Sequence, residues 1–145
     1  MPLGVVEKSI LIAAPAEMIF DFIADPTSLS IAWPAMTEVR DVIPNPLGGA
    51  DFSWTYRMAG MRFEGQTRIT EYERPRRLTG VSIFGITSVV TWTLQPQGNA
   101  TLVTMYGEYD LPPSPFRKIA RPFVIQENLK EAELILTTIK GKLEG

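Results

Sequence analysis

Two side chains that carry much of protein chemistry are missing from this chain of 145 residues, which has no cysteine and no histidine. Without cysteine there is no disulfide, no thiolate metal ligand and no cysteine nucleophile. Without histidine the chain lacks the commonest general base and the commonest metal ligand, and every serine–histidine catalytic arrangement is excluded. Any acid–base chemistry would therefore fall to Asp, Glu, Tyr, Lys or Arg.

An excess of positive charge is lacking as well. Lys and Arg number 14 against 16 Asp and Glu, which gives a net charge of −2 and argues against a broad nucleic-acid-binding surface. No apolar run approaches the roughly 20 residues of a membrane helix. The first eight residues also lack the basic start and apolar stretch of a signal peptide. We therefore expect a cytoplasmic protein with no integral membrane segment and no nucleic-acid partner.

The residues that are present have an ordinary globular composition, 45% hydrophobic and 21% charged, rather than the composition of a disordered chain. A domain near this size buries about 68–70% of the surface that its unfolded chain exposes, so a sizeable core can form. No internal repeat or low-complexity segment is visible. We expect a single domain over residues 1–145.

The first third of the chain predicts one strand and two short helices. Residues 5–13 are rich in Val and Ile and predict the strand. Pro15 suits the first position of a helix and Glu17 lies near the positive end of its dipole. This helix should end at Asp25 because the next residue is proline. A second short helix is expected at 27–32.

From Met36 onward, the hydrophobic period changes to the alternation that is typical of strands. Short breaks rich in Gly and Pro indicate hairpins between them, and hence an antiparallel meander. The predicted strands are 36–43, 51–58, 61–73, 77–84, 86–95 and 101–110. Alternation within residues 52–58 predicts one buried and one solvated face. The buried set is Phe52, Trp54, Tyr56 and Met58, and the solvated set is Ser53, Thr55 and Arg57.

The end of the chain predicts helix. A short helical turn is expected at 115–120, and Pro122 then fits the first position of a long helix that runs to about Lys140. Apolar residues recur in this helix at spacings of three and four and form one predicted seam: Ile125, Leu129, Ala132, Leu136, Ile139 and Leu143. A helix of about 20 residues is roughly 30 Å long and can lie along the concave side of a sheet of ten-residue strands.

This order of elements predicts an α+β fold with space inside it. A long antiparallel sheet twists and curls, and a single helix about 10 Å across does not fill the trough that seven strands make. Either large side chains fill the remaining volume or an apolar cavity stays open. Sequence spacing does not decide between the two.

Several local patterns match a known family: residues 9–26, which run from a strand into Ala14-Pro15-Ala16-Glu17, then 33–34, 65–78, 92–96 and 101–104. Together they resemble the START-like, helix-grip superfamily, in particular its polyketide cyclase/dehydrase and lipid-transport branch. The resemblance implies a curved seven-stranded antiparallel sheet wrapped around a long C-terminal helix, with two short helices between strands 1 and 2. It also implies an apolar cavity and no universal catalytic motif.

We expect the cavity to have apolar and aromatic walls, with the hydroxyls of Tyr56 and Tyr109 as the polar groups best suited to orient a ligand. Trp33 and the loop 59–61 should guard its mouth. The predicted ligand-binding residues are Trp33, Trp54, Tyr56, Met58, Phe63, Trp92, Met105, Tyr109, Ile125 and Leu129. No constellation of residues supports a catalytic group, a metal site or a cofactor, so none is assigned.

Three functions are compatible with this cavity. The first is binding or transport of a hydrophobic small molecule, which the resemblance suggests is a lipid, an isoprenoid or a polyketide-like compound. The second is a polyketide cyclase, aromatase or dehydratase, although the missing histidine argues against a histidine-dependent form. The third is a chaperone-like protein-interaction module. Whether the chain is an enzyme and whether it forms a homodimer stay open.

Overall fold

One antiparallel sheet of seven strands forms the frame of the protein, in the spatial order β1-β7-β6-β5-β4-β3-β2. The computed structural model describes residues 4–58, 60–110 and 117–144, with the backbone alone at 117–121 and 123. The strands are β1 (Gly4–Ile12), β2 (Met36–Pro44), β3 (Ala50–Met58), β4 (Met61–Glu73), β5 (Arg77–Ile83), β6 (Thr87–Gln97) and β7 (Ala100–Asp110). Consecutive hairpins join β2 to β7, and β1 pairs with β7, so β1 and β2 are the two edges.

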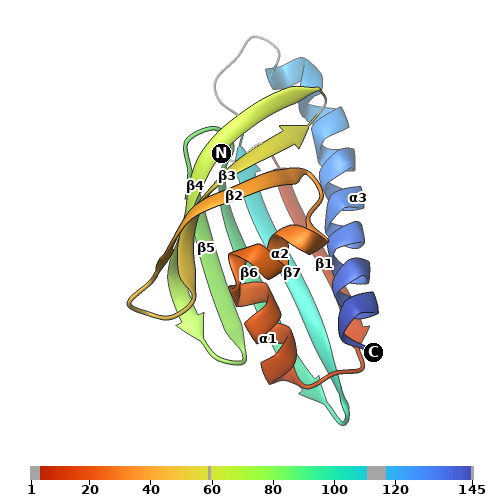
Figure 1. Cartoon of the computed structure of the whole chain (residues 1–145). Coiled ribbons are helices and arrows are strands. Elements are labelled where there is room, and N and C mark those ends of the chain that lie inside the picture. The colour runs from red at the N-terminus through yellow and green to blue at the C-terminus, as the bar shows by residue number, and fades with distance from the viewer. Residues whose placement is uncertain (1–3, 59, 111–116, 145) are drawn as a thin grey trace.

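Three helices accompany the sheet: α1 (Ala16–Ala24), α2 (Pro26–Ala32) and α3 (Arg117–Leu143). The strands curl around the inner space, α3 runs along the length of the sheet, and α1 and α2 lie in front of it (Figure 1). The predicted helix-grip fold is confirmed. Within the described ranges, no helix combines the length and apolar character needed to cross a membrane.

Proline lies at the start of both short helices, and α2 also has a side-chain cap. Pro15 is the N-cap of α1 rather than its first residue. At the start of α2, the Asp25 carboxylate accepts hydrogen bonds from the Thr27 backbone N–H (3.1 Å) and the Ser28 hydroxyl (2.9 Å), and Pro26 occupies the first helical position. The contact with Thr27 satisfies one of the N–H groups that a helix start leaves without partners.

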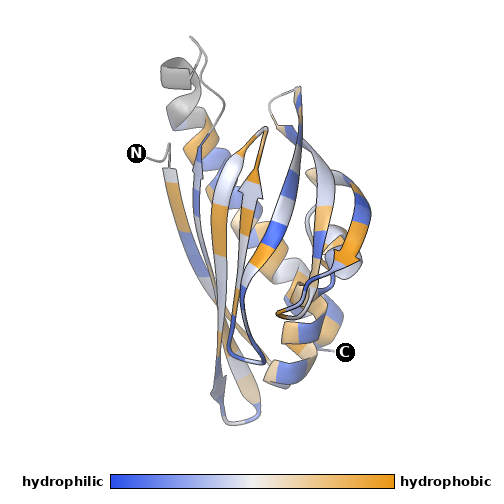
Figure 2. Cartoon of the chain, turned by 90° about the vertical axis from the view of Figure 1, so that its left-hand side faces the viewer, coloured by the Kyte–Doolittle hydropathy of each residue, from blue (hydrophilic) through white to orange (hydrophobic). Residues whose placement is uncertain are grey.

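Alternation along the strands creates the core, and Figure 2 shows hydrophilic and hydrophobic residues following one another along them. The inward residues form two clusters. The larger joins α1 and the C-terminal half of α3 to the sheet and includes Phe20, Val103, Ile135 and Ile139, all fully buried. The smaller is rich in aromatic residues: Met36, Phe52, Trp54, Tyr56, Met58, Tyr109 and Val124. This second cluster positions the site described below.

The predicted apolar seam of α3 is correct in its second half and wrong in its first. Ala132, Leu136 and Ile139 are buried, whereas Leu129 is 37% exposed and Ile125 is only partly buried. The residues that face inward in the first half are Val124, Asn128 and Glu131. The prediction of this seam used apolar residues alone. It therefore did not include Asn128 and Glu131, two polar residues that face inward.

The predicted start of this helix also needs correction. We expected Pro122 at the first helical position, but α3 already begins at Arg117 and Pro122 lies inside it. Proline removes one backbone donor, and α3 continues through this lost hydrogen bond. Of the helical turn predicted at 115–120, residues 115 and 116 lie outside the described part of the chain.

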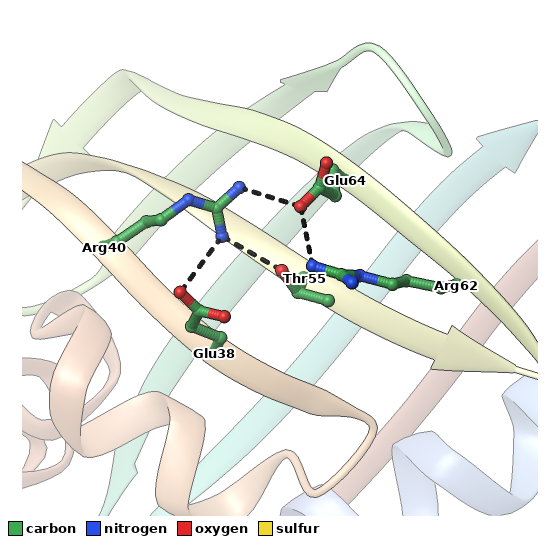
Figure 3. A network of polar contacts seen from close by, with 5 residues as sticks. All are labelled: Glu38, Arg40, Thr55, Arg62 and Glu64. Carbon is green, nitrogen blue, oxygen red and sulfur yellow. Dashed lines mark hydrogen bonds and ion pairs between the residues drawn. The ribbon is translucent and has the colours of Figure 1, made fainter.

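Ser53 and Thr55 were expected on a solvated face, yet they are only 8% and 3% exposed. Long charged side chains from the neighbouring strands lie over Thr55 (Figure 3). The Arg40 guanidinium donates to the Thr55 hydroxyl at 3.0 Å and forms an ion pair with Glu64 at 3.5 Å. Two further ion pairs, Arg40–Glu38 and Arg62–Glu64, extend this layer. The outer face of β3 is therefore polar but shielded from water at Ser53 and Thr55, whereas Arg57 is exposed as predicted.

Gly65 provides the first test of this packing. In the β3–β4 pair it lies opposite Trp54, and a Cβ at position 65 would lie 2.5 Å from the Trp54 ring and 2.9 Å from the Phe84 carbonyl oxygen. We expect Gly65→Ala to lower the free energy of unfolding by about 1–3 kcal/mol, because ring and backbone must both move. Urea denaturation measures this change.

Gly141→Ala is the matched control, because Gly141 lies in α3 and a Cβ there meets no atom within 4 Å. Alanine is a better helix former than glycine, so this variant should be more stable by about 0.5–1 kcal/mol. A Gly65→Ala protein as stable as the unmodified chain would contradict the packing described for Trp54.

Candidate functional site

A pocket of about 120 Å³ lies where the two core clusters meet. Its walls are the concave face of the sheet, the segment from Ile23 to Met36 and one side of α3. Cavities of this scale hold small apolar molecules in other proteins. Most of the lining is aliphatic or aromatic, which matches the general character of ligand pockets.

Most residues predicted to contact a ligand do line this pocket. Those on the lining are Trp33, Trp54, Tyr56, Met58, Trp92, Met105 and Tyr109. Three predicted residues are not on it: Phe63 packs against the smaller cluster, and Ile125 and Leu129 lie on other sides of α3. Of the predicted mouth loop, residue 59 lies outside the described residues. That any of these side chains binds a ligand stays a prediction.

The most polar feature of the pocket is the carboxylate of Glu131, which the sequence analysis missed. Trp33 donates its indole Nε1–H to Oε1 of Glu131 at 2.7 Å. The Tyr56 hydroxyl lies 2.8 Å from Oε1 and 2.6 Å from Oε2. Helical spacing could have revealed this group, because Glu131 follows Val124 and Asn128 and precedes Ile135 at intervals of four, three and four. Its charge excluded it from an apolar seam.

The surroundings of Glu131 change how it ionises. Burial raises the pKa of its carboxyl, the hydrogen bonds from Tyr56 and Trp33 partly offset this, and the nearby Glu127 carboxylate raises the pKa further. By contrast, ion pairs hold the pKa of the surface carboxyls of Asp21 and Glu71 below their usual range. A carboxyl whose pKa is raised by desolvation inside a pocket is a typical functional group.

Tyr56 acts as a hydrogen-bond donor to Glu131. Burial raises the pKa of its phenol, and the negative charge of Glu131 raises it further. The phenol therefore keeps its proton and directs it to the carboxylate.

A second polar set lies on the sheet side of the pocket. Trp54 donates its indole N–H to the Thr67 hydroxyl at 2.9 Å, and the hydroxyls of Thr67 and Ser82 share a hydrogen bond of 2.7 Å. Ser88 is the cross-strand partner of Ser82, and all three residues line the pocket. We call Thr67, Ser82 and Ser88 the hydroxyl row. It offers a ligand small donors and acceptors across three neighbouring strands.

Metal binding has no support in this geometry. Over the described ranges, no three acidic side chains lie close enough together to hold a metal ion.

The raised pKa of Glu131 gives a pH-dependent prediction. The unfolded chain has the ordinary glutamate pKa and the folded chain a higher one, so the folded state binds this proton more tightly. Stability should therefore fall as pH rises from the ordinary value through the raised value, and then level off. Glu131→Gln lacks this titration. Urea denaturation over a pH series should show the unmodified protein losing stability relative to Glu131→Gln across this interval.

The subtraction isolates Glu131, because the surface carboxyls with lowered pKa values titrate in both proteins. A stability difference between the two proteins that stays constant with pH would contradict the burial of this group.

Comparison with known proteins supports the fold over the whole chain. A family model described as polyketide cyclase/dehydrase and lipid transport matches residues 4–143. Among curated proteins, no sequence matches the chain.

Three solved structures illustrate the likeness. The Zhui aromatase/cyclase from a Streptomyces species has 14% identity and a TM-score of 0.81, with 97% of this chain and 93% of that chain covered. The protein TTHA0849 from Thermus thermophilus has 19% identity and a TM-score of 0.76, with 97% of each chain covered. A START superfamily protein from Mycobacterium smegmatis has 17% identity and a TM-score of 0.73, again with 97% of each chain covered.

Sequence identities from 14% to 19% show a common fold alone. The family model is independent of them and matches residues 4–143. The resemblance noted in the sequence is thereby confirmed: the chain shares the fold of the START superfamily protein and belongs to the polyketide cyclase/dehydrase and lipid transport family.

Proposed function

We propose that the chain binds an apolar small molecule in the pocket between the sheet and α3. The observation that carries this proposal is an open volume of about 120 Å³ with mostly apolar walls. Protein interiors normally pack as densely as organic crystals. Space that side chains leave unfilled forfeits packing contacts and so lowers stability. Such a cost is understandable if the volume serves an occupant.

Two details of the lining favour a ligand over further side-chain packing. Val90 lies between two glycines, Gly80 on β5 and Gly107 on β7, and all three residues line the pocket. Because neither glycine has a side chain, the pocket reaches the backbone of the sheet on both sides of Val90. At the same time, the Glu131 carboxylate and the hydroxyl row supply a few polar groups at fixed places, as ligand pockets usually do. The family description, which includes lipid transport, agrees with a lipid-like or polyketide-like ligand.

Filling this space should abolish binding. Val90→Phe places a ring between the two glycines, so we expect the affinity for the apolar fluorophore N-phenyl-1-naphthylamine to fall about tenfold or more. Fluorescence titration of protein stripped by organic extraction measures this. Val89→Phe is the control, because Val89 is the preceding residue of β6 and is 39% exposed.

The control should bind the fluorophore as the unmodified protein does. Binding that is absent from the stripped protein, or equal in Val90→Phe and the unmodified protein, would overturn the proposed function.

A second candidate function, acid–base catalysis in the same pocket, is favoured by the contact between Glu131 and Tyr56. An ionised Glu131 can remove a proton from the carbon next to a ligand carbonyl and then pass it to a departing hydroxyl group. The Tyr56 phenol keeps its own proton and orients the Glu131 carboxylate through their hydrogen bond. A carbon–carbon double bond forms and water leaves with the proton that Glu131 had taken, so both side chains end in the state in which they began. The aromatase/cyclase among the structural neighbours agrees with such chemistry at the level of the fold.

This candidate can be tested with a synthetic β-hydroxyketone thioester incubated with stripped protein. If the pair is catalytic, mass spectrometry should detect the dehydrated product, and both Glu131→Gln and Tyr56→Phe should lower its rate of formation by about 10²-fold or more. Val89→Phe should leave the rate unchanged. Equal rates with all four proteins would rule out catalysis by this pair.

A further inference from the structure

The charged side chains that the described residues contribute to the pocket lining are of one sign. Among the described lining residues there is no lysine and no arginine, whereas Glu131 and Glu108 are both present. The Glu108 carboxylate accepts a hydrogen bond of 3.0 Å from Tyr106. Tyr106 and Glu108 lie on one face of β7 and Tyr109 lies on the other, because side chains alternate along a strand. Glu131 is therefore the charged group that faces a guest.

Glu131 also has an acceptor position to spare. An ionised carboxylate offers about four lone-pair positions and no donor. The described residues supply two protons, one from the Trp33 indole and one from the Tyr56 hydroxyl. Indole N–H groups only donate, so Trp33 holds Oε1 in the role of an acceptor. Among the described residues, Oε2 has a single hydrogen-bond contact, with Tyr56, and a ligand donor can occupy its remaining position.

We propose that Glu131 selects the ligands of this pocket by charge and hydrogen-bonding type. This inference rests on the proposed function. Apolar molecules that carry an ammonium or a hydroxyl group bind, and apolar carboxylates are rejected. An ammonium or hydroxyl group donates to the free position on Oε2. A ligand carboxylate would bring a second negative charge into a poorly solvated pocket whose described lining offers no cation to pair with it. The predicted ligand class is a neutral or cationic hydrophobic alcohol or amine.

A matched set of probes tests this selectivity. The probes are 2-naphthylmethylamine, 2-naphthalenemethanol and 2-naphthoate, which share one ring system and differ in the group attached to it. Isothermal titration calorimetry with stripped protein in mildly alkaline buffer should rank the affinities in that order. The alcohol should bind at least about tenfold more tightly than the carboxylate, because like charges placed together disfavour binding strongly.

Two variants with the same change of charge assign the effect to its residue. Glu131→Gln should raise the affinity for naphthoate and lower that for the amine, each about tenfold, so that the preference collapses. Glu127→Gln is the control, because Glu127 precedes Glu131 by one turn of α3 but does not line the pocket. The order of the three probes should survive in this variant.

The outcomes separate this inference from the function on which it rests. If N-phenyl-1-naphthylamine binds the unmodified protein, yet naphthoate binds as tightly as the alcohol or Glu131→Gln keeps the original order, charge selection is wrong and the binding function stands. If neither the fluorophore nor any naphthalene probe binds, the proposed function fails and charge selection fails with it.

Discussion

The hydrogen bonds that the Glu131 carboxylate accepts from Tyr56 and Trp33 join α3 to β3 and to the residue that follows α2. These three elements surround the pocket, so one buried polar group fixes their separation. A carboxylate removed from water destabilises the fold unless donors satisfy it. Here a phenol with a raised pKa and an indole, neither of which gives up its proton readily, provide the donors. The pocket is arranged around a group that the protein must keep hydrogen-bonded.

The sheet supplies the space that this arrangement holds open. The strands curl around the inner space, with α3 along one side of it (Figure 1), and Gly80 and Gly107 line the pocket with backbone alone. Close packing resumes beyond the pocket, where Ile135 and Ile139 of α3 contact the larger cluster and are fully buried. The core is thus closely packed around the C-terminal half of α3, whereas the pocket lies beside Asn128, Glu131 and Ala132 of the same helix.

The sequence predicted the parts of this structure that follow from regular alternation. Period two along residues 52–58 placed Trp54 and Tyr56 on the inner face, and the Gly- and Pro-rich breaks placed the hairpins. It failed where a polar residue faces inward. Glu131 was passed over because apolar periodicity drew the seam of α3 through Leu129, on another side of the helix. Contacts between Glu131, Tyr56 and Trp33 connect positions 75 and 98 residues apart, and no local pattern reports them.

The shielding of Ser53 and Thr55 was unpredictable for a related reason. A polar strand face is normally solvated, but here Arg40 reaches across from β2 to the Thr55 hydroxyl. The direction of a long side chain depends on neighbours that are known only once the strands are paired. The alternation of polar and apolar residues predicted which side chains share a strand face. Tertiary contacts determine how exposed each face is to solvent.

The proposed function requires a pocket that binds a small molecule. Native mass spectrometry of the freshly purified protein tests this most directly. We expect a population heavier than the bare chain by the mass of a small hydrophobic compound, which organic extraction removes and an added apolar alcohol replaces. A spectrum that contains the bare chain alone, both before and after an apolar alcohol is added, would contradict the account.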